Sequence, residues 1–87
     1  MHEMSLMQDL MKKITAVAER ERAKKVVSVD VWLGALSHMS AEHFIEHFSE
    51  VSAGTLADGA RLNIETSQDV KDPMAQSILF RGLEISE

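Results

Sequence analysis

The sequence predicts an α+β fold in which two helices pack on one face of a three-stranded sheet. Two segments carry apolar residues at every third or fourth position, which is the pattern of amphipathic helices. Three other segments alternate apolar and polar residues or are enriched in β-branched ones, as half-buried strands do. The segments follow one another in the order α-β-α-β-β. Placing both helices on one face of the sheet is the simplest way to bury both apolar stripes.

The first helix is expected from about Ser5 to Lys24, with Ser5 as its N-cap. Its apolar stripe repeats at helical spacing and is widened by methionines, which at such spacing are more often core filler than metal ligands. The stripe consists of Leu6, Leu10, Ile14, Val17 and Ala18. Basic residues gather where this helix should end, where they complement the helix dipole. A docking patch for an acidic partner is the alternative interpretation of this basic cluster, which consists of Arg20, Arg22, Lys24 and Lys25.

Strict alternation between Val27 and Leu33 predicts the first strand, with the four aliphatic residues on one face and Ser28, Asp30 and Trp32 on the other. Ser40 is then expected to cap a second amphipathic helix. Its apolar positions are Ala41, Phe44, Ile45, Phe48 and Val51. Gly54 is well placed to end this helix.

A turn at Asp58-Gly59 leads to a second half-buried strand, in which Ala60, Leu62 and Ile64 alternate with polar residues. The polar segment 66–76 holds the only proline and is expected to be a loop. A last strand is expected over 77–85. Its alternation slips by one residue at Arg81-Gly82, which indicates a β-bulge or a bend.

Composition narrows the classes of function. The chain has 87 residues, of which 45% are hydrophobic, so one small globular domain is expected. It has no cysteine, which excludes a thiolate zinc site and a cysteine nucleophile. No apolar run is long enough to cross a bilayer and no secretory signal opens the chain, so we expect a cytoplasmic protein without membrane contact. The net charge is −5, which argues against nucleic-acid binding. No nucleophile motif or phosphate-binding glycine loop is present, so no enzymatic activity is expected.

The opening residues Met1, His2 and Glu3 form a candidate metal site. A terminal amine, the His2 imidazole and the backbone nitrogens between them can close small chelate rings around one ion. Such a nitrogen-rich, near-planar arrangement suits Ni(II) or Cu(II). It requires that the chain start at Met1 in the cell. The alternative is that these residues are simply a frayed, solvated end.

Three further histidines are auxiliary candidates. His43 and His47 are four residues apart, so they share one side of the second expected helix and could hold a divalent cation. The more ordinary interpretation is a solvated polar face opposite the apolar stripe. His38 lies in the loop before that helix. It could join a site if the loop lies near the N-terminus.

Four ordered blocks of sequence resemble one protein family, the HypA/HybF-type hydrogenase nickel-insertion accessory proteins. The first block is the opening Met-His-Glu-Met-Ser-Leu. The second runs from Val31 to Ser37 and is similar to the family's strand and its Gly-x-Leu-Ser exit. The third runs from Gly54 to Glu65 and is close to the family's Gly-Thr-x-x-Glu-Gly-Ala-x-Leu-x-Ile stretch. The fourth, from Phe80 to Ile85, looks like its closing strand. The likeness covers nearly all of the chain, in register.

This resemblance implies a nickel metallochaperone that delivers Ni(II) to the [NiFe]-hydrogenase large subunit, working with a HypB-type GTPase. The family's nickel ligands are the N-terminal amine, the side chain of the histidine at position 2 and backbone nitrogens at positions 2 and 3. They map onto Met1, His2 and Glu3. We therefore expect one nickel-binding-type domain over residues 1–87, with Ni(II) as its cargo and a homo-oligomer as an open option. His43 and His47 are not part of the family pattern, so no role carries over to them.

The chain departs from the family in one large respect. Family members carry a zinc domain with two Cys-x-x-Cys pairs before the last strand. Residues 67–76, which we interpret as a linker, stand in its place, so no structural zinc is expected. Two smaller departures are Asp58, where glutamate is usual, and Ala41, where the family favours proline.

Two alternatives to nickel delivery remain at this point. The first is a protein-interaction module that keeps the fold without moving metal, which the missing zinc domain favours. The second is the maturation of another metalloenzyme.

Overall fold

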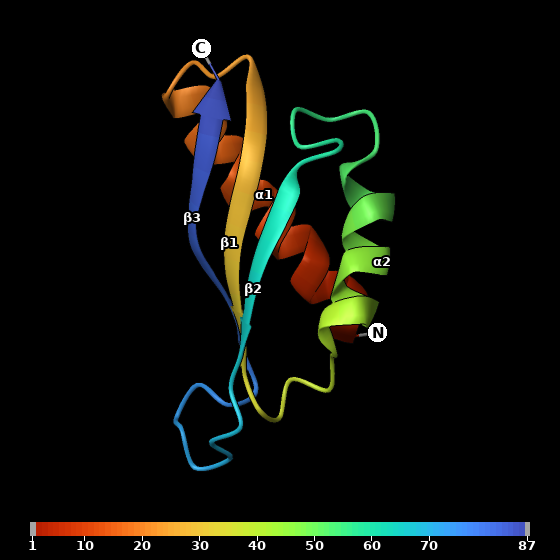
Figure 1. The fold of residues 1–87 in the computed structure, drawn as a ribbon, viewed down its shortest axis with the longest axis vertical. Coiled ribbons are helices and arrows are strands. Elements are labelled where there is room, and N and C mark those ends of the chain that lie inside the picture. Colours follow the sequence, from red (N-terminus) through yellow and green to blue (C-terminus); the bar gives the residue numbers. More distant parts are fainter. Residues whose placement is uncertain (1, 87) are drawn as a thin grey trace.

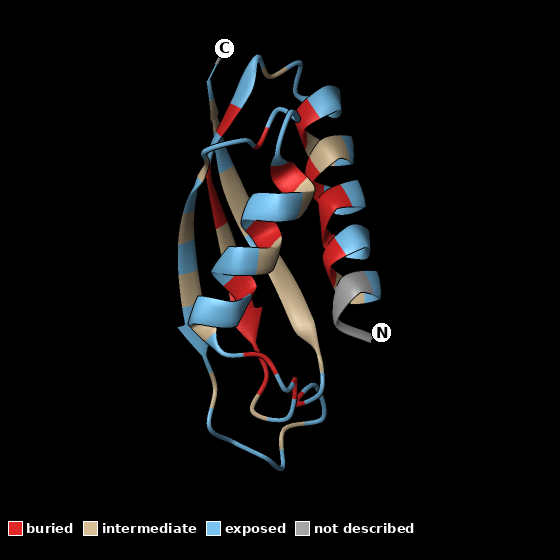
Figure 2. Ribbon diagram, turned by 90° about the vertical axis from the view of Figure 1, so that its right-hand side faces the viewer, coloured by how far each residue is buried: buried red, intermediate tan, exposed pale blue. Residues whose placement is uncertain are grey.

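The computed structural model describes the backbone of residues 2–86 and the side chains of residues 5–86. Two helices and three strands follow one another as α1 (His2–Arg20), β1 (Lys25–Leu33), α2 (Ala41–Ser52), β2 (Arg61–Thr66) and β3 (Ile78–Ser86). The helices cover one face of the sheet (Figures 1 and 2). This arrangement confirms the predicted α+β class and the order α-β-α-β-β. None of the described helices is long and apolar enough to cross a membrane.

The central strand of the sheet is β1, which pairs in parallel with β2 on one side and antiparallel with β3 on the other. A parallel pair needs a crossover connection, and α2 supplies it between β1 and β2. The two helices run in broadly the same direction, so the first turns of both lie near each other (Figures 1 and 2). Of the candidate metal residues with described side chains, His43 and His47 belong to α2 and His38 to the loop before it.

The first helix begins and ends earlier than the sequence indicated. It begins at His2, so the prediction that Ser5 is its N-cap is wrong; Ser5 is an exposed residue inside the helix. It ends at Arg20 rather than Lys24, because the backbone closes a Schellman motif there. The amide of Ala23 donates to the carbonyl of Ala18, and the amide of Arg22 donates to that of Glu19. Arg22 takes the left-handed conformation that this motif requires, with φ of 57°.

The first strand contains an irregularity that the alternation did not reveal. Val26 pairs with Ile85 and Ser28 with Glu84, so Val27 is an extra residue in a bulge. The prediction that Val27 faces the core is therefore wrong. It is 39% exposed, whereas Val26 is fully buried. The bulge predicted at Arg81-Gly82 is confirmed, because Arg81 is the extra residue between the partners of Asp30 and Val31.

The second helix agrees with its sequence signals except at Ile45. The Ser40 side chain accepts a hydrogen bond from the His43 amide at 3.1 Å, which confirms the predicted N-cap. Gly54 follows the helix with φ of 78°, a conformation that glycine adopts without strain. Phe44 and Phe48 are buried, but Ile45 is 45% exposed, so its prediction as a stripe residue is wrong.

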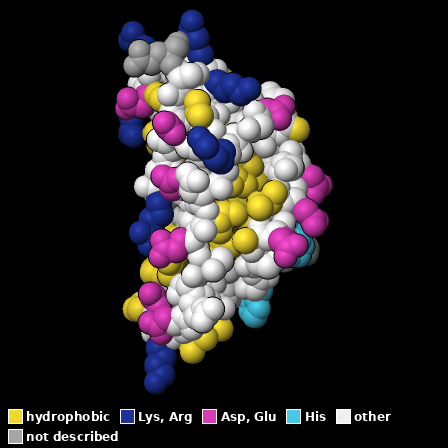
Figure 3. Space-filling model, viewed as in Figure 1, with side chains coloured by type: hydrophobic (Ala, Val, Ile, Leu, Met, Phe, Trp, Pro, Cys, Tyr) yellow, Lys and Arg dark blue, Asp and Glu magenta, His cyan; other side chains and the backbone are white. Residues whose placement is uncertain are grey.

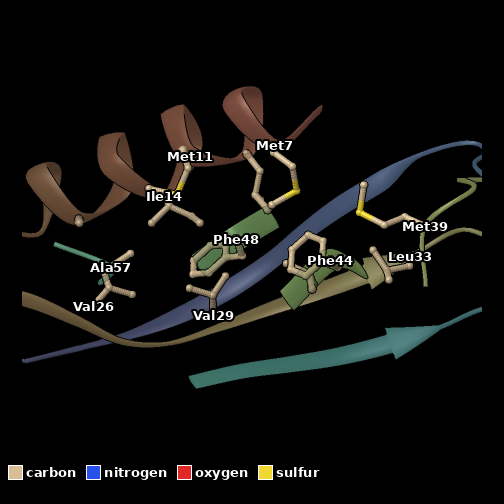
Figure 4. Packing of buried hydrophobic residues seen from close by; sticks show 13 residues of the cluster. Met7, Met11, Ile14, Val26, Val29, Leu33, Met39, Phe44, Phe48 and Ala57 are labelled. Atoms are coloured by element: carbon tan, nitrogen blue, oxygen red, sulfur yellow. The ribbon is translucent and has the colours of Figure 1, made fainter. Parts of the chain in front are cut away.

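The core fills the space between the helices and the sheet. Figure 2 shows the buried residues of α1 along the side that faces the rest of the molecule, and Figure 4 shows how the side chains meet. Met7, Met11 and Ile14 point from α1 toward Phe44 and Phe48 of α2. The strand residues in this cluster are Val26, Val29, Val31 and Leu33. On the opposite face of the sheet, Trp32 is 6% exposed and lies under the Arg81 guanidinium, 5.8 Å from the ring centroid.

The segment between β2 and β3 is a compact loop held against the end of β1. Gly34 donates its amide hydrogen to the carbonyl of Ser77, and Leu36 donates to that of Ala75. A side chain at position 34 would overlap the carbonyl of Ala75, so glycine is required there. Side chains within the loop cap its turns, as when the Asp72 carboxylate accepts from the Met74 amide at 2.7 Å.

Candidate metal centre

The first residues of α1 form the head of a helix. An α-helix leaves its first four amide groups without partners inside the helix. Because α1 begins at His2, the backbone nitrogens of positions 2 and 3 belong to this set. Met1 and the side chains of His2 and Glu3 lie outside the described residues. The structure describes their setting, which is a first helical turn whose backbone nitrogens the helix itself does not use.

A cavity of about 350 Å³ lies beside this helix head. Ser5 and Leu6 line it from α1, and Leu36, Ser37, His38 and Gln76 line it from the two loops. In a helix, residues three and four positions apart share a face, so position 2 lies one turn before the Ser5–Leu6 pair. The condition set for His38 in the sequence analysis is therefore met: its loop lies next to the start of the chain that the structure describes.

The backbone holds His38 in an unusual conformation. Its φ is 60°, in the left-handed region, and its side chain is exposed between the buried residues Ser37 and Met39. Non-glycine residues in this region cluster at functional sites, although histidine tolerates it better than most. The Ser37 hydroxyl oxygen is buried at the same cavity and has no hydrogen-bond partner among the described residues. Two polar side chains with ligand chemistry therefore line the space beside the helix head.

The second pair of histidines is brought together as the spacing predicted. The rings of His43 and His47 lie 4.7 Å apart between centroids, at an interplanar angle of 34°. His43 is exposed, whereas the His47 side chain is 22% exposed and both of its ring nitrogens are buried. The His47 Nδ1 lies 3.8 Å from a carboxylate oxygen of Glu50. The description of this face as a fully solvated one therefore fits His43 but not His47.

Among residues with described side chains, no group of three or more histidines or carboxylates is placed to hold a metal. The candidate metal ligands therefore form three groups, which are the helix head, His38 at the cavity, and the His43–His47 pair. Sequence reasoning missed Gln76 and Ser37 as neighbours of the helix head. Nothing in their local sequence could have identified them, because loop packing alone brings position 76 next to α1.

A groove lies between α2 and β2. Its lining combines the apolar residues Ile45, Phe48, Ala60 and Leu62 with Ser49, Ser52, Asp58 and Gly59. Figure 3 shows hydrophobic side chains gathered in the middle of this face. The exposed Ile45, which the periodicity assigned to the core, belongs to this groove.

Solved structures share the fold. The chain superposes on the solution structure of the Ni metallochaperone HypA from Helicobacter pylori with a TM-score of 0.78, at 18% identity, over 97% of both chains. It superposes on a second solution structure, of HypA protein, with a TM-score of 0.73 at 20% identity. At these identities the likeness concerns the fold alone.

Curated relatives share the sequence as well. Hydrogenase maturation factor HypA of Picosynechococcus sp. is 39% identical over 76% of this chain and 58% of its own length. The factor of the same name from Archaeoglobus fulgidus is 38% identical over 78% of this chain and 62% of its own. The chain thus matches about three fifths of the length of these relatives.

The family model described as "Hydrogenase/urease nickel incorporation, metallochaperone, hypA" matches residues 1–71. The match begins at the candidate metal residues and ends inside the loop between β2 and β3, having covered both helices and the parallel strand pair. The descriptions of the family and its members are those of metallochaperones and maturation factors. With this match and the identities above, the chain belongs to the HypA family of hydrogenase and urease nickel-incorporation proteins.

Proposed function

We propose that this protein binds Ni(II) at the head of α1 and delivers it to a metalloenzyme during assembly. The ligands are the Met1 amine, the His2 imidazole and the backbone nitrogens of His2 and Glu3. The observation that carries the proposal is that α1 begins at His2, because the helix then makes no internal use of those nitrogens. The choice of nickel as the metal rests on membership of the family.

The setting of the site suits a cargo rather than a resident metal. The helix head borders an open cavity, so an ion bound there remains within reach of a partner. His38 is exposed at that cavity, and we assign it a supporting role as a weaker side-chain donor. Nickel binding releases protons from the amine and the amides, so affinity should rise with pH.

Isothermal titration of the protein with Met1 as its first residue tests the site. His2→Ala is expected to weaken Ni(II) binding by about 100-fold or more, beyond the 10- to 100-fold that loss of an outer-shell partner costs. A Gly-Ser extension before Met1 should have the same effect, because it moves the amine away from His2. His38→Gln, the matched control on the facing loop, should change affinity by less than about tenfold. Unchanged affinity in His2→Ala and in the extended form would disprove the site.

For delivery, we propose the [NiFe]-hydrogenase large subunit as the recipient and a HypB-type GTPase as a working partner, in the cytoplasm. The family and its hydrogenase maturation factors support this choice. Ni(II) transfer from loaded protein to the purified large subunit, followed by loss of metal from the donor, is the direct measurement. Metal preference in vitro is a poor guide, because copper outcompetes nickel at nitrogen ligands by the Irving–Williams order.

The groove between α2 and β2 favours a second candidate function, that of an interaction module without metal transfer. The exposed Ile45 lines it beside polar residues, and an exposed apolar side chain in a polar rim suits a protein partner. The two functions differ in their dependence on nickel. Capture of maturation partners that is indifferent to Ni(II) and to His2→Ala, but lost on Ile45→Asp, would favour the module.

A further inference from the structure

We propose that β2 is the edge through which two copies of this chain pair, so that their two three-stranded sheets become continuous. The strand order is β2-β1-β3, and among the described strands β2 pairs only with β1. The outer edge of β2 therefore presents a row of backbone groups to which a further strand can bond. This pairing uses no metal ligand, so it stands or falls independently of the proposed function.

The backbone groups at this edge belong to Leu62, Ile64 and Thr66. The amide of Ser67 donates to the carbonyl of Leu33 at 2.9 Å, so the backbone groups of Ser67 point toward β1. Alternate residues of a strand direct these groups to the same side, so the odd-numbered residues of β2 also bond to β1. The even-numbered residues direct their N–H and C=O groups the opposite way, toward the open edge.

The strand β2 lacks features that commonly protect the edge of a sheet. Natural edge strands are often blocked by lysine, by proline or by a bulge. β2 contains neither of these residues, and its register with β1 is regular. The strand at the opposite edge, β3, carries the bulge at Arg81. A further strand is therefore expected to add at β2 rather than at β3.

The sequence of β2 is complementary to itself in an antiparallel pair. Asn63 is flanked by Arg61 two positions before it and by Glu65 two positions after it. A twofold axis at Asn63 sets Arg61 of each copy opposite Glu65 of the other. In the same register Leu62 lies opposite Ile64 of the second copy. Both of these residues have outward backbone groups, so each such pair exchanges two hydrogen bonds.

Charge selects this register over the neighbouring ones. The outward backbone groups meet only when even-numbered residues lie opposite even-numbered ones, so the nearest alternatives have their axis at Leu62 or at Ile64. An axis at Leu62 sets Arg61 opposite Asn63, and an axis at Ile64 sets Glu65 opposite Asn63. Only the axis at Asn63 pairs opposite charges, and symmetry makes it do so twice.

The side chains that would face each other are accessible. Arg61 and Glu65 are exposed, and neither forms an ion pair with a residue whose side chain the structure describes. Asn63 is also exposed, and its side-chain amide donates to Oδ1 of Asp30 at 2.7 Å. Because Asn63 carries no charge, the pair of asparagines at the axis adds no charge repulsion.

The groove between α2 and β2 borders the same edge. The twofold axis runs perpendicular to the sheet, so α2 of the second copy arrives on the face that the helices already cover (Figures 1 and 2). Ile45 is 45% exposed and lines this groove together with Leu62. A second copy would cover this groove, and burial of its apolar side chains would favour the pair. The interface is small, so a weak and reversible dimer is expected.

Sedimentation equilibrium of the full chain over a wide range of concentrations tests the pairing. A chelator is present throughout, because it excludes dimers that are bridged by a metal ion. We expect a reversible monomer–dimer equilibrium. Arg61→Glu sets like charges opposite each other at two places and should weaken dimerisation by about tenfold. Glu65→Arg should act in the same way, and the double variant, which exchanges the two charges, should restore the dimer.

Lys13→Glu is the matched control. It makes the same change of net charge as Arg61→Glu, at an exposed position on α1, and should leave dimerisation unchanged. Circular dichroism of each variant separates loss of the dimer from loss of the fold.

Amide hydrogen exchange of the unmodified chain, followed by NMR, provides a second measurement that needs no variant. The amides of Leu62 and Ile64 should gain protection as the concentration rises. Those of Asn63 and Glu65, which already bond to β1, should be protected at every concentration.

Four outcomes would overturn the proposal. They are a chain that stays monomeric at all concentrations, equal effects of Arg61→Glu and Lys13→Glu, a double variant that does not restore the dimer, and a dimer in which the amides of Leu62 and Ile64 gain no protection. A chain that stays monomeric would leave the groove and the strand edge to a different protein. None of these outcomes bears on the N-terminal nickel site.

Discussion

Backbone conformation at single residues decides where the elements of this fold end. Arg22 ends α1 in the left-handed region, with φ of 57°, and His38 takes the same region in the loop before α2. Both lie where a glycine would be the usual choice. At Arg22 the hydrogen bonds of the Schellman motif compensate for the unfavourable conformation. At His38 the neighbours Ser37 and Met39 are buried, whereas the imidazole between them is exposed at the cavity.

At Gly34, the addition of a single methyl group should lower the stability of the fold strongly. A methyl group there would overlap the Ala75 carbonyl, so Gly34→Ala should lower the free energy of unfolding by about 1–3 kcal/mol. Urea unfolding measures the loss. Gly82→Ala is the control, because its added carbon would meet only Asp30 Oδ2, at 3.7 Å, an ordinary contact. Equal effects at both positions would contradict this reasoning.

Local features, namely a helix cap and two β-bulges, set the positions of helix and strand residues in this fold. The N-cap at Ser40 sets the start of α2 and hence the turns on which His43 and His47 lie. The two bulges in the β1–β3 pair lie on opposite strands, with Val27 extra on one and Arg81 on the other. Each shifts the register by one residue in the opposite sense, so the strands stay paired over their whole length while Val26 and Val31 both face the core.

The N-cap of α2 can be tested directly. Ser40→Ala removes the acceptor of the His43 amide and should lower the free energy of unfolding by about 1 kcal/mol. Thermal and urea unfolding both measure this quantity. Ser49→Ala, at an exposed position inside the same helix, should be neutral or slightly stabilising because alanine is the better helix former. If Ser40→Ala is as harmless as Ser49→Ala, the hydrogen bond does not stabilise the helix.

On the scale of the whole molecule, the loop between β2 and β3 has two parts. We expect one to tolerate insertions and the other not. Val70 is 57% exposed, whereas Ala75 is 3% exposed and its carbonyl accepts from the Leu36 amide at 2.7 Å. The family model ends at residue 71, inside this loop. We propose that the outer half of the loop, around Val70, is the point at which the family's zinc domain is inserted, because the inner half, around Ala75, closes the rest of the fold.

Insertions at two points of the loop test this division. A Gly-Ser segment after Val70 that doubles the loop length should cost only about 0.6 kcal/mol of unfolding free energy. The same segment after Ala75 should cost more than about 2 kcal/mol, because it separates Ala75 from Ser77 and disrupts the two backbone hydrogen bonds that these residues accept from Leu36 and Gly34. Urea unfolding of both forms measures the difference. Equal costs would show that the inner half does not hold the loop in place.

The sequence was sufficient to predict the type and order of the elements, the cap at Ser40 and the bulge at Arg81. Each of these depends on periodicity or on residues within one turn of each other, so it can be predicted locally. The residues of the N-terminal site were likewise chosen from sequence, and their ligation stays a prediction. Sequence was misleading at Val27, where the alternation was regular but strand pairing shifted the register, and at Ile45, where helical spacing could not show that the groove stays open.

Only the tertiary structure decided what lies beside the helix head. The order of the strands, with β1 in the centre, depends on pairings between residues more than thirty positions apart. The same long-range contacts bring His38 and Gln76 to a cavity beside the first turns of α1, and the start of α2 lies near those turns (Figure 1). The physical reason is that local propensity chooses the conformation of each segment, whereas burial of the shared core chooses how segments meet. The candidate nickel-binding motif could thus be predicted from the sequence, but its surroundings became visible only in the folded molecule.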